Sequence, residues 1–387
     1  MRLWGFAGLG CAVIACSFDP GGAATAFDAA SARPDGFRPP RLAMDGSVIV
    51  PSADASATFT GTRRLVTLTG PRPATDLTNV PILVVLDSTR IDYTLAGDGA
   101  AVHFTDVSGA VFFAHEIERW NSSGRSYVWV KVPTVSASAD TKFYLRYGPV
   151  VRPTDNAPTG VWSNDYVGVW HLGEDVNDET SGAIHADATG RGNDGVQHNC
   201  GPMVDDTGAI GIAQDFDGVD DFIDIDQAGL QGQVNVTTEA RVRLRSEPVR
   251  FPHVVGGGTN GRYWQIFWER DLGWANRYRV NGVQRDNRTS AGSVDTWSSL
   301  ASVYDGTAVR LYLDGVLVES DNGSGALDAL NTSLYIGDNP SLSPRGFDGA
   351  IDELRISSVA RSAAWIDLQH RTLTDNLLDF GPAETPQ

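Results

Sequence analysis

Short apolar runs separated by turn residues dominate the chain after residue 60. Gly, Asp, Asn and Pro punctuate these runs, and apolar positions do not recur at helical spacing. In the first half, runs rich in Val, Ile, Phe and Tyr occupy residues 65–69, 81–87, 102–104, 110–117, 126–132 and 141–147. The pattern predicts an antiparallel β-sandwich over residues 61–150.

A second β-rich region follows a link, 148–159, that contains three prolines. Its clearest feature is a predicted three-stranded meander over 297–320. Asp-Gly pairs at 305–306 and 314–315 are expected to form its turns, because Asp-Gly supplies the positive φ values of tight hairpins. Ser362 can cap one short helix over 363–370. We therefore expect an all-β fold class, with two antiparallel β-sandwich domains in series, the second over 160–382.

The N-terminus has the pattern of an export signal. After Arg2, the residues up to 15 are apolar or small and uncharged, a run too short to span the roughly 30 Å core of a bilayer. The residues Val13-Ile14-Ala15-Cys16 resemble the lipobox of bacterial lipoproteins. That resemblance implies cleavage of residues 1–15 and a membrane lipid anchor on the Cys16 thiol; an ordinary secretory signal with an incidental Cys16 is the alternative.

Residues 16–60 are dominated by Ala, Ser, Pro, Gly and Asp, which cannot bury enough apolar surface to offset the entropy of ordering. We expect a disordered tether that presents the folded part at the cell envelope, outside the cytoplasm, on the outer membrane or the cell surface.

Composition narrows the classes of partner. The 387 residues carry a formal net charge of −18, which argues against a nucleic-acid partner. The chain has 3 cysteines, and Cys200 would stand alone after processing and lipidation, so no disulfide framework is expected.

The first β-rich region resembles the bacterial domain of unknown function 2341 (DUF2341). The matching segments are NVPILV at 79–84, HFTD at 103–106, HEIERWN at 115–121, VWVKVP at 128–133 and YLRYG at 144–148. The acidic residue usual before the HF strand is replaced by Ala101-Val102. Because that family has no settled biochemical role, the resemblance implies architecture and not chemistry.

The second region resembles the laminin-G-like (LamG) jelly roll of the concanavalin A-like lectin and glucanase superfamily. The matching segments are DATGRGN at 187–193, FDG at 216–218, DDF at 220–222, IG at 336–337 and FDGAIDELRI at 347–356. The resemblance implies two curved antiparallel sheets, one of them with a concave face.

Catalytic signatures are not evident. Glycanases of that superfamily carry two Glu flanking an Asp on one strand, one as nucleophile and one as acid/base. The nearest run here, at 269–271, has one Glu and one Asp. We therefore expect a binding protein and not an enzyme, one that recognises a glycan or an envelope protein. A purely structural envelope component and a cryptic glycoside hydrolase are the alternatives.

Two candidate sites follow. In related jelly rolls one Asp near the start of the last strand holds a structural ion, which by motif implies Ca²⁺ at Asp352, with Asp217 as a second ligand; a turn-capping Asp352 is the equal alternative. For ligand binding, strand alternation assigns the tryptophans at 264, 268 and 274 to the core. The opposite strand faces carry planar polar and aromatic groups suited to a sugar or an acidic glycan, although a solvated surface is the plainer reading. These candidates are Tyr263, Gln265, Arg277, Arg279 and Tyr312, with Arg310 beside the last.

Overall fold

The computed structural model describes residues 61–149, 155–174, 182–200, 210–226, 233–289, 293–342 and 344–385. Ala53–Gln387 form one compact unit. Cys16 and the expected tether lie outside the described residues, so the lipid anchor stays a prediction. Among the described residues, no helix is both long and apolar enough to cross a membrane.

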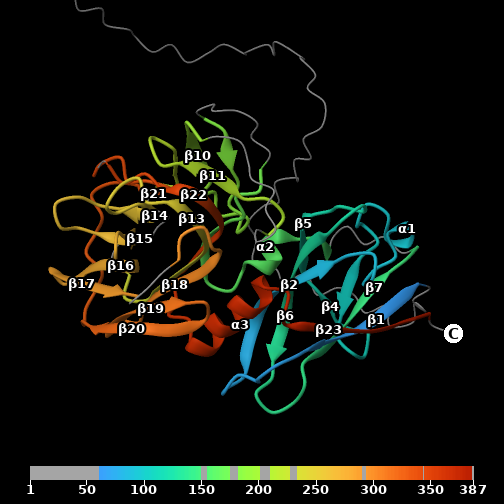
Figure 1. Cartoon of the computed structure of the whole chain (residues 1–387). Coiled ribbons are helices and arrows are strands. Elements are labelled where there is room, and N and C mark those ends of the chain that lie inside the picture. The colour runs from blue at the N-terminus through green and yellow to red at the C-terminus, as the bar shows by residue number, and fades with distance from the viewer. Residues whose placement is uncertain are drawn as a thin grey trace, which may run out of the picture. The chain divides into compact units, whose positions relative to one another are not determined.

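Two sheets build the first sandwich (Figure 1). One has the strand order β23-β1-β7-β3-β4 and the other the order β2-β6-β5, with antiparallel pairing throughout. The strands are β1 Thr62–Leu68, β2 Leu77–Leu86, β3 His103–Thr105, β4 Phe112–Phe113, β5 His115–Arg119, β6 Ser126–Val135, β7 Lys142–Tyr147 and β23 Leu378–Glu384. Two one-turn helices, α1 Tyr93–Ala96 and α2 Pro158–Val161, accompany them. The expected strand over 110–117 is broken into β4 and β5.

Two larger sheets face each other in the second sandwich. The eight-stranded sheet has the order β17-β16-β15-β14-β21-β12-β10-β9, and the seven-stranded sheet has the order β11-β22-β13-β18-β19-β20 with β8 also paired to β22. The first sheet comprises β9 Ile184–His185, β10 Gly195–His198, β12 Phe222–Asp224, β14 His253–Gly257, β15 Trp264–Glu269, β16 Gly273–Val280, β17 Val283–Arg288 and β21 Leu334–Ile336. The second comprises β8 Tyr166–Trp170, β11 Gln214–Asp217, β13 Val236–Ser246, β18 Ser298–Tyr304, β19 Ala308–Leu313, β20 Val316–Asn322 and β22 Asp348–Ser357.

The expected fold class is confirmed. The meander is β18-β19-β20, and its second turn has positive φ at both Asp314 (49°) and Gly315 (82°), the geometry that Asp-Gly favours. Trp264, Trp268 and Trp274 lie in the core between the two large sheets, as the alternation predicts.

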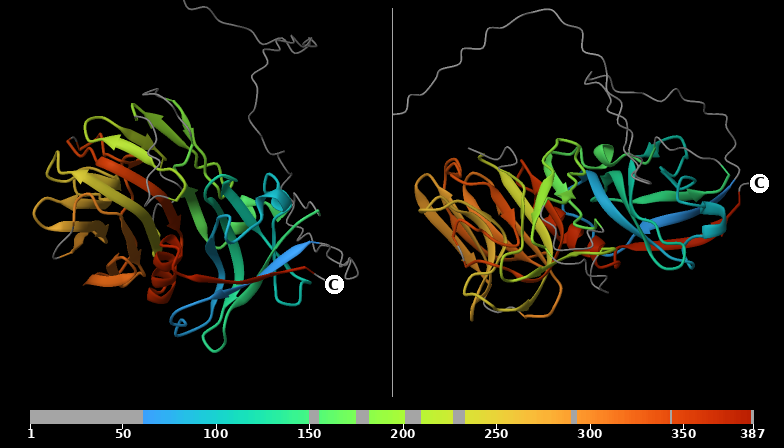
Figure 2. Two further views of the ribbon diagram at one scale, coloured as in Figure 1. Left: turned by 45° about the vertical axis from the view of Figure 1, so that its right-hand side comes forward. Right: turned by 90° about the horizontal axis from the view of Figure 1, so that it is seen from above.

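The C-terminal strand does not stay with the second sandwich. β23 pairs antiparallel with β1, from Leu68 opposite Leu378 to Arg63 opposite Glu384, and Arg63 Nε donates to Glu384 Oε2 at 2.9 Å. Figure 2 shows this strand running along β1 in both views. Our sequence-based limit of 382 for the second domain therefore includes a strand that completes the first sandwich's sheet.

Helix α3, Ala363–Leu373, links the two sandwiches. Ser362 caps it, as expected, by accepting a hydrogen bond from the backbone N–H of Trp365. The Gln369 side chain donates to Pro81 O of β2 at 3.0 Å and accepts from Arg355 of β22 at 2.8 Å. One hydrophobic cluster joins the first sandwich's core to Trp365 and Leu368 of α3 and to Val303 and Tyr312 of the seven-stranded sheet. The part of that sheet's outer face around Val303 and Tyr312 is consequently buried by the chain's own elements.

Candidate functional site

The eight-stranded sheet places four of the five predicted ligand residues on adjacent strands. Gln265 of β15 lies opposite Arg277 of β16 in the ladder, and the Arg279 N–H donates to Tyr263 O at 2.9 Å. Because Trp264 and Tyr278 point into the core, these four side chains point outward, away from the sandwich interior. The structure therefore brings together the sequence-predicted residues of this sheet.

Tyr312 is not part of that surface. It lies on β19 of the seven-stranded sheet, is 4% exposed, and packs in the cluster that includes α3. The predicted ligand residue Tyr312 is therefore buried: alternation placed its side chain on the side that leaves the sandwich interior, but that side packs in the cluster that includes α3.

Two side chains near Gly256 of β14 are the most informative feature of the outer face. A Cβ added at Gly256 would lie 3.1 Å from His253 Nδ1 and 3.3 Å from Gln265 Cγ, so both side chains pack closely over this glycine. His253 Nδ1 and Gln265 Nε2 are buried and have no hydrogen-bond partner among the described residues. Leaving such groups unsatisfied costs about 1–3 kcal/mol each.

Arginines and phenylalanines cover this polar pair. The Arg277 guanidinium lies 5.1 Å from the centre of the Phe267 ring, and Arg345 lies 5.2 Å from that of Phe251. Burial, and then the charges of Arg345 and Arg277, hold the pKa of His253 well below its usual range, so the ring is neutral at pH 7. We name this surface, made of His253, Gly256, Gln265, Phe267, Arg277 and Arg345, the β14–β16 face.

Carboxylates balance part of its positive charge. Asp286 of β17 accepts from Arg277 Nε at 2.9 Å. Asp338, which follows β21, is 5% exposed, and burial raises its pKa to about 6. The face thus combines fixed charges with a neutral imidazole and a free amide donor.

The two predicted metal residues do not form one calcium site. Asp217 lies opposite Asp348 in the β11–β22 ladder. Asp348 precedes Asp352 by four residues on β22, so roughly 13 Å of strand separates Asp352 from the position opposite Asp217. Asp352 is fully buried, its Oδ2 accepts from the Ile210 N–H at 2.6 Å, and burial together with Glu353 raises its pKa. Calcium prefers six to eight oxygen ligands, and this pair of residues does not offer a shared set.

Asp217 does belong to an acidic group. Carboxylate oxygens of Asp217, Asp220 and Asp221 lie within 4.8 Å of one another. The Asp217 N–H donates to Asp221 Oδ2, and the Val219 N–H donates to Asp217 Oδ1, both at 2.7 Å. These bonds are those of a tight loop.

A second charged cluster lies where the first sandwich meets β8 and β22. His171, directly after β8, has Nδ1 2.6 Å from Glu353 Oε1 and Nε2 3.2 Å from Glu116 Oε2. Its Nδ1 also lies 3.7 Å from Glu118 Oε2. Burial by itself would lower the pKa of His171, but the carboxylates of Glu353, Glu116 and Glu118 outweigh it and raise that pKa. We name these four residues the His171 cluster.

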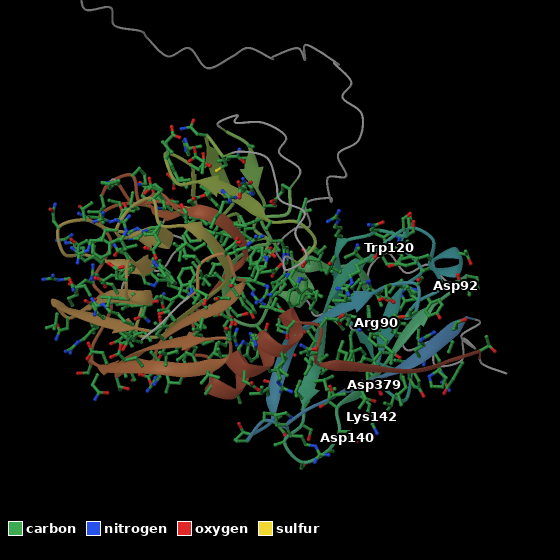
Figure 3. All side chains as sticks on the ribbon, viewed as in Figure 1. Arg90, Asp92, Trp120, Asp140, Lys142 and Asp379 are labelled. Carbon is green, nitrogen blue, oxygen red and sulfur yellow. The ribbon has the colours of Figure 1, made fainter. Side chains whose placement is uncertain are left out.

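A polar hollow of about 390 Å³ opens near the end of α3, lined by residues that include Leu68, Arg72, Asp140 and Arg371. Its charges are already paired: Arg72 and Lys142 lie 2.6 Å and 3.3 Å from Asp140, and Figure 3 shows Asp140 and Lys142 together at one edge of the first sandwich. Its volume is comparable to that of a ligand site, but its polar groups have partners.

Sequence reasoning missed His253, Arg345 and the whole His171 cluster. Glu116 and Glu118 alternate on β5, and this period-2 signal was available in the sequence. No sequence pattern connects these residues to Glu353, which follows Glu118 by 235 positions. Only tertiary packing brings β5 and β22 together.

Two β-sandwiches of which the second is a lectin-type jelly roll define the class of this protein. Residues 217–367 match the family profile described as the concanavalin A-like lectin/glucanases superfamily, and residues 98–166 match that of DUF2341. Both resemblances in the sequence are therefore confirmed in kind and order. No curated protein matches the chain.

Several solved structures resemble part of the chain. Domain 4 of AbnA, an extracellular arabinanase from Geobacillus stearothermophilus in complex with arabinotriose, is 21% identical over 52% of this chain and 97% of that chain, with a TM-score of 0.40. The binding domain of Paraclostridial Mosquitocidal Protein 1 is 12% identical over 54% and 52%, with a TM-score of 0.41. Trypanosoma rangeli sialidase is 14% identical over 66% and 42%, with a TM-score of 0.42. At these values the likenesses do not bear on activity.

Proposed function

We propose that this protein is a glycan-binding protein and that the β14–β16 face holds the sugar. The observation that carries the proposal is the pair of unsatisfied polar atoms, His253 Nδ1 and Gln265 Nε2, beside Gly256. A sugar hydroxyl both donates and accepts, so one hydroxyl, or two on adjacent carbons, can donate to the neutral imidazole and accept from the amide.

The surroundings of this pair suit the rest of a sugar ring. Phe251, which is partly exposed and lies 5.9 Å from the buried Phe267 ring, offers apolar surface, and Arg277, one-fifth exposed, offers planar donors toward solvent. The side chains that cover His253 and Gln265 include arginines, whose long flexible stems can turn aside without a change in the backbone. Arginine donors also match a carboxylate, so acidic sugars belong in the test beside neutral ones.

The test is a glycan array with the full chain, followed by calorimetric titration with the best neutral and acidic hits. Gln265→Leu keeps the side-chain volume and removes the amide donor; we expect about a tenfold loss of affinity, the value of one net hydrogen bond. Arg310→Ala is the matched control, because Arg310 is an ion-paired arginine on the other sheet. If no glycan binds at millimolar concentration, the proposal is wrong; if Gln265→Leu binds as wild type, the site lies elsewhere.

Glycan hydrolysis is the alternative, since the superfamily's description includes glucanases. The acid on β15, Glu269, is 6% exposed, and its Oε2 accepts a hydrogen bond from Arg288 Nε at 2.6 Å. A carboxylate that is paired in this way is not free to act as a general acid or base. If the wild type releases reducing sugar from a polysaccharide and Glu269→Gln does not, the proposed function becomes glycan hydrolysis in place of glycan binding.

We also propose display of this protein at the cell envelope through lipidated Cys16, on the strength of the lipobox-like residues alone. Labelled palmitate should enter the wild type and not Cys16→Ser. Equal incorporation into both would contradict the lipid anchor and leave the glycan site untouched.

A further inference from the structure

A β-bulge in β22 turns two successive acids to the same side of the seven-stranded sheet. In the β13–β22 ladder Arg241 lies opposite Asp352 and Glu239 opposite Arg355, so Glu353 and Leu354 face the single residue Ala240. Glu353 has a φ of 54°, outside the usual range of a strand. Ile351 and Leu354 remain in the core, while the Glu353 carboxylate reaches the His171 ring on the sheet's outer side.

Donor atoms from three separate segments of the chain meet there. Glu118 comes from β5 of the first sandwich, Glu353 from β22, and His171 follows β8. One donor atom from each lies within 4.8 Å of the other two. Four-coordinate zinc with bonds of about 2.0–2.1 Å requires ligand atoms roughly 3.3 Å apart, so shifts of about 1 Å would give the three donors that spacing, with water as the fourth ligand.

We propose that Glu118, His171 and Glu353 bind a divalent transition-metal ion, of which Zn²⁺ is the best fit. The ligand atoms are His171 Nδ1, Glu353 Oε1 and Glu118 Oε2. Imidazole nitrogen with two carboxylate oxygens is a donor set that suits zinc better than calcium, which takes oxygen ligands.

The surroundings of these donors have the arrangement of a metal's supporting residues. Glu116 Oε2, 3.2 Å from His171 Nε2, can accept a hydrogen bond from the Nε2–H group. Nδ1 is then free for the metal, as in other carboxylate–histidine–metal arrangements. Trp129 Nε1 donates to Glu118 Oε2 at 2.8 Å, and Trp162 Nε1 donates to Glu116 Oε2. Glu116 and the two tryptophans are positioning residues for the three ligands.

An independent observation also points to a cation. Glu353 is fully buried, and its Oε2 has no hydrogen-bond partner among the described residues; Arg355 Nε lies 3.9 Å from it. Asp352 Oδ1, on the adjacent residue, is likewise buried and without a hydrogen bond there. Burying carboxylate oxygens with incomplete pairing is costly, and a bound divalent ion relieves that cost. The His171 side chain is 12% exposed and offers the ion a route in.

Such an ion would fasten the two sandwiches together, because Glu118 belongs to the first and Glu353 to the second. The proposal does not depend on glycan binding at the β14–β16 face, which uses different residues on the other sheet.

The first test measures metal in the full chain. After treatment with a chelator and removal of it, the protein is dialysed against Zn²⁺, and bound metal is counted by mass spectrometry. We expect one tightly held Zn²⁺ per chain and a rise in Tm of about 5 °C with Zn²⁺ over chelator. Co²⁺ in its place should give a visible absorption band typical of a nitrogen- and oxygen-ligated site.

Two variants locate the ion. Glu118→Gln and His171→Ala should each lose the bound Zn²⁺, the Co²⁺ band and the Tm rise. Asp217→Asn, at an exposed carboxylate outside the His171 cluster, is the matched control and should keep all three. Should the variants fail to fold, the wild type still decides: no tight Zn²⁺ and no Tm rise overturn the proposal. Tight Zn²⁺ that persists in folded Glu118→Gln and His171→Ala overturns it as well.

Discussion

The two outer faces of the jelly roll look alike in sequence and have different fates in the structure. Both carry a tyrosine predicted to bind ligand: Tyr263 before β15 and Tyr312 on β19. Tyr263 is partly exposed beside the β14–β16 face, whereas Tyr312 is 4% exposed and packs in the cluster with α3. The difference teaches that alternation along a strand identifies the side that leaves the core, but not whether another part of the chain covers that side.

Separating the sandwiches should have the largest effect. A fragment of residues 160–377 would bare the face around Val303 and Tyr312 and remove the partners of α3, so we expect no cooperative unfolding transition. Near-UV circular dichroism and size-exclusion chromatography check this against the full chain. A monomeric fragment with a sharp transition would show that the seven-stranded face needs no cover.

Truncating the two tyrosines compares the faces directly. Tyr312→Ala should lower the free energy of unfolding by about 3–5 kcal/mol, because it leaves a cavity in a core. Tyr263→Ala should change that free energy by about 0.5 kcal/mol or less. Urea denaturation of both full-length variants measures the two values, and equal losses would contradict the contrast between the faces.

Asp338, which interacts with Arg345 of the β14–β16 face, makes the stability of the protein depend on pH. Its pKa is about 6 in the folded chain against 3.8 for an ordinary Asp, so the folded state holds the proton more tightly. Ionisation of Asp338 therefore lowers the free energy of unfolding. This loss is absent below about pH 4, grows as pH rises, and is complete above about pH 6. Asp338→Asn should therefore stabilise the protein at pH 7 by up to about 3 kcal/mol and have little effect near pH 4.

Denaturation midpoints across pH 4–7 test this prediction. Asp271→Asn, at an exposed turn of the same sheet, serves as the control. A gain from Asp338→Asn that is the same at pH 4 and pH 7 would assign the effect to packing and not to the proton.

The smallest effect is expected at the closing strand. The Arg63–Glu384 pair joins β1 to β23, and its side chains are 34% and 43% exposed. Glu384→Ala should cost at most about 1 kcal/mol, and less at high salt, because exposed ion pairs are weak and screened. A loss that does not respond to salt would mean that β23 is held through this residue by something other than charge.

Much of the fold was readable from local pattern. Short apolar runs gave β1, β2, β6 and β7 to within a few residues, Asp314-Gly315 gave its hairpin, and Ser362 gave the start of α3. Each of these depends on neighbours in sequence: side-chain alternation, positive φ at a turn, or a hydroxyl that caps a helix.

The candidate sites were only partly readable. Gln265 and Arg277 could be placed on one face because β15 and β16 are joined by a short turn. The packing of His253 and Gln265 over Gly256 depends on where β14 lies beside β15, and the His171 cluster depends on a bulge in β22 meeting β5.

The sequence by itself determined an all-β chain, its jelly roll, its core tryptophans and the absence of the familiar glucanase acids. Tertiary structure alone decided that β23 returns to β1, that Tyr312 is buried in the cluster with α3, and that Glu118 and Glu353 share one histidine. The physical reason is the range of the interactions. Turns, caps and strand alternation are set by residues a few positions apart, whereas covering a face or collecting buried charges requires packing between segments tens to hundreds of residues apart.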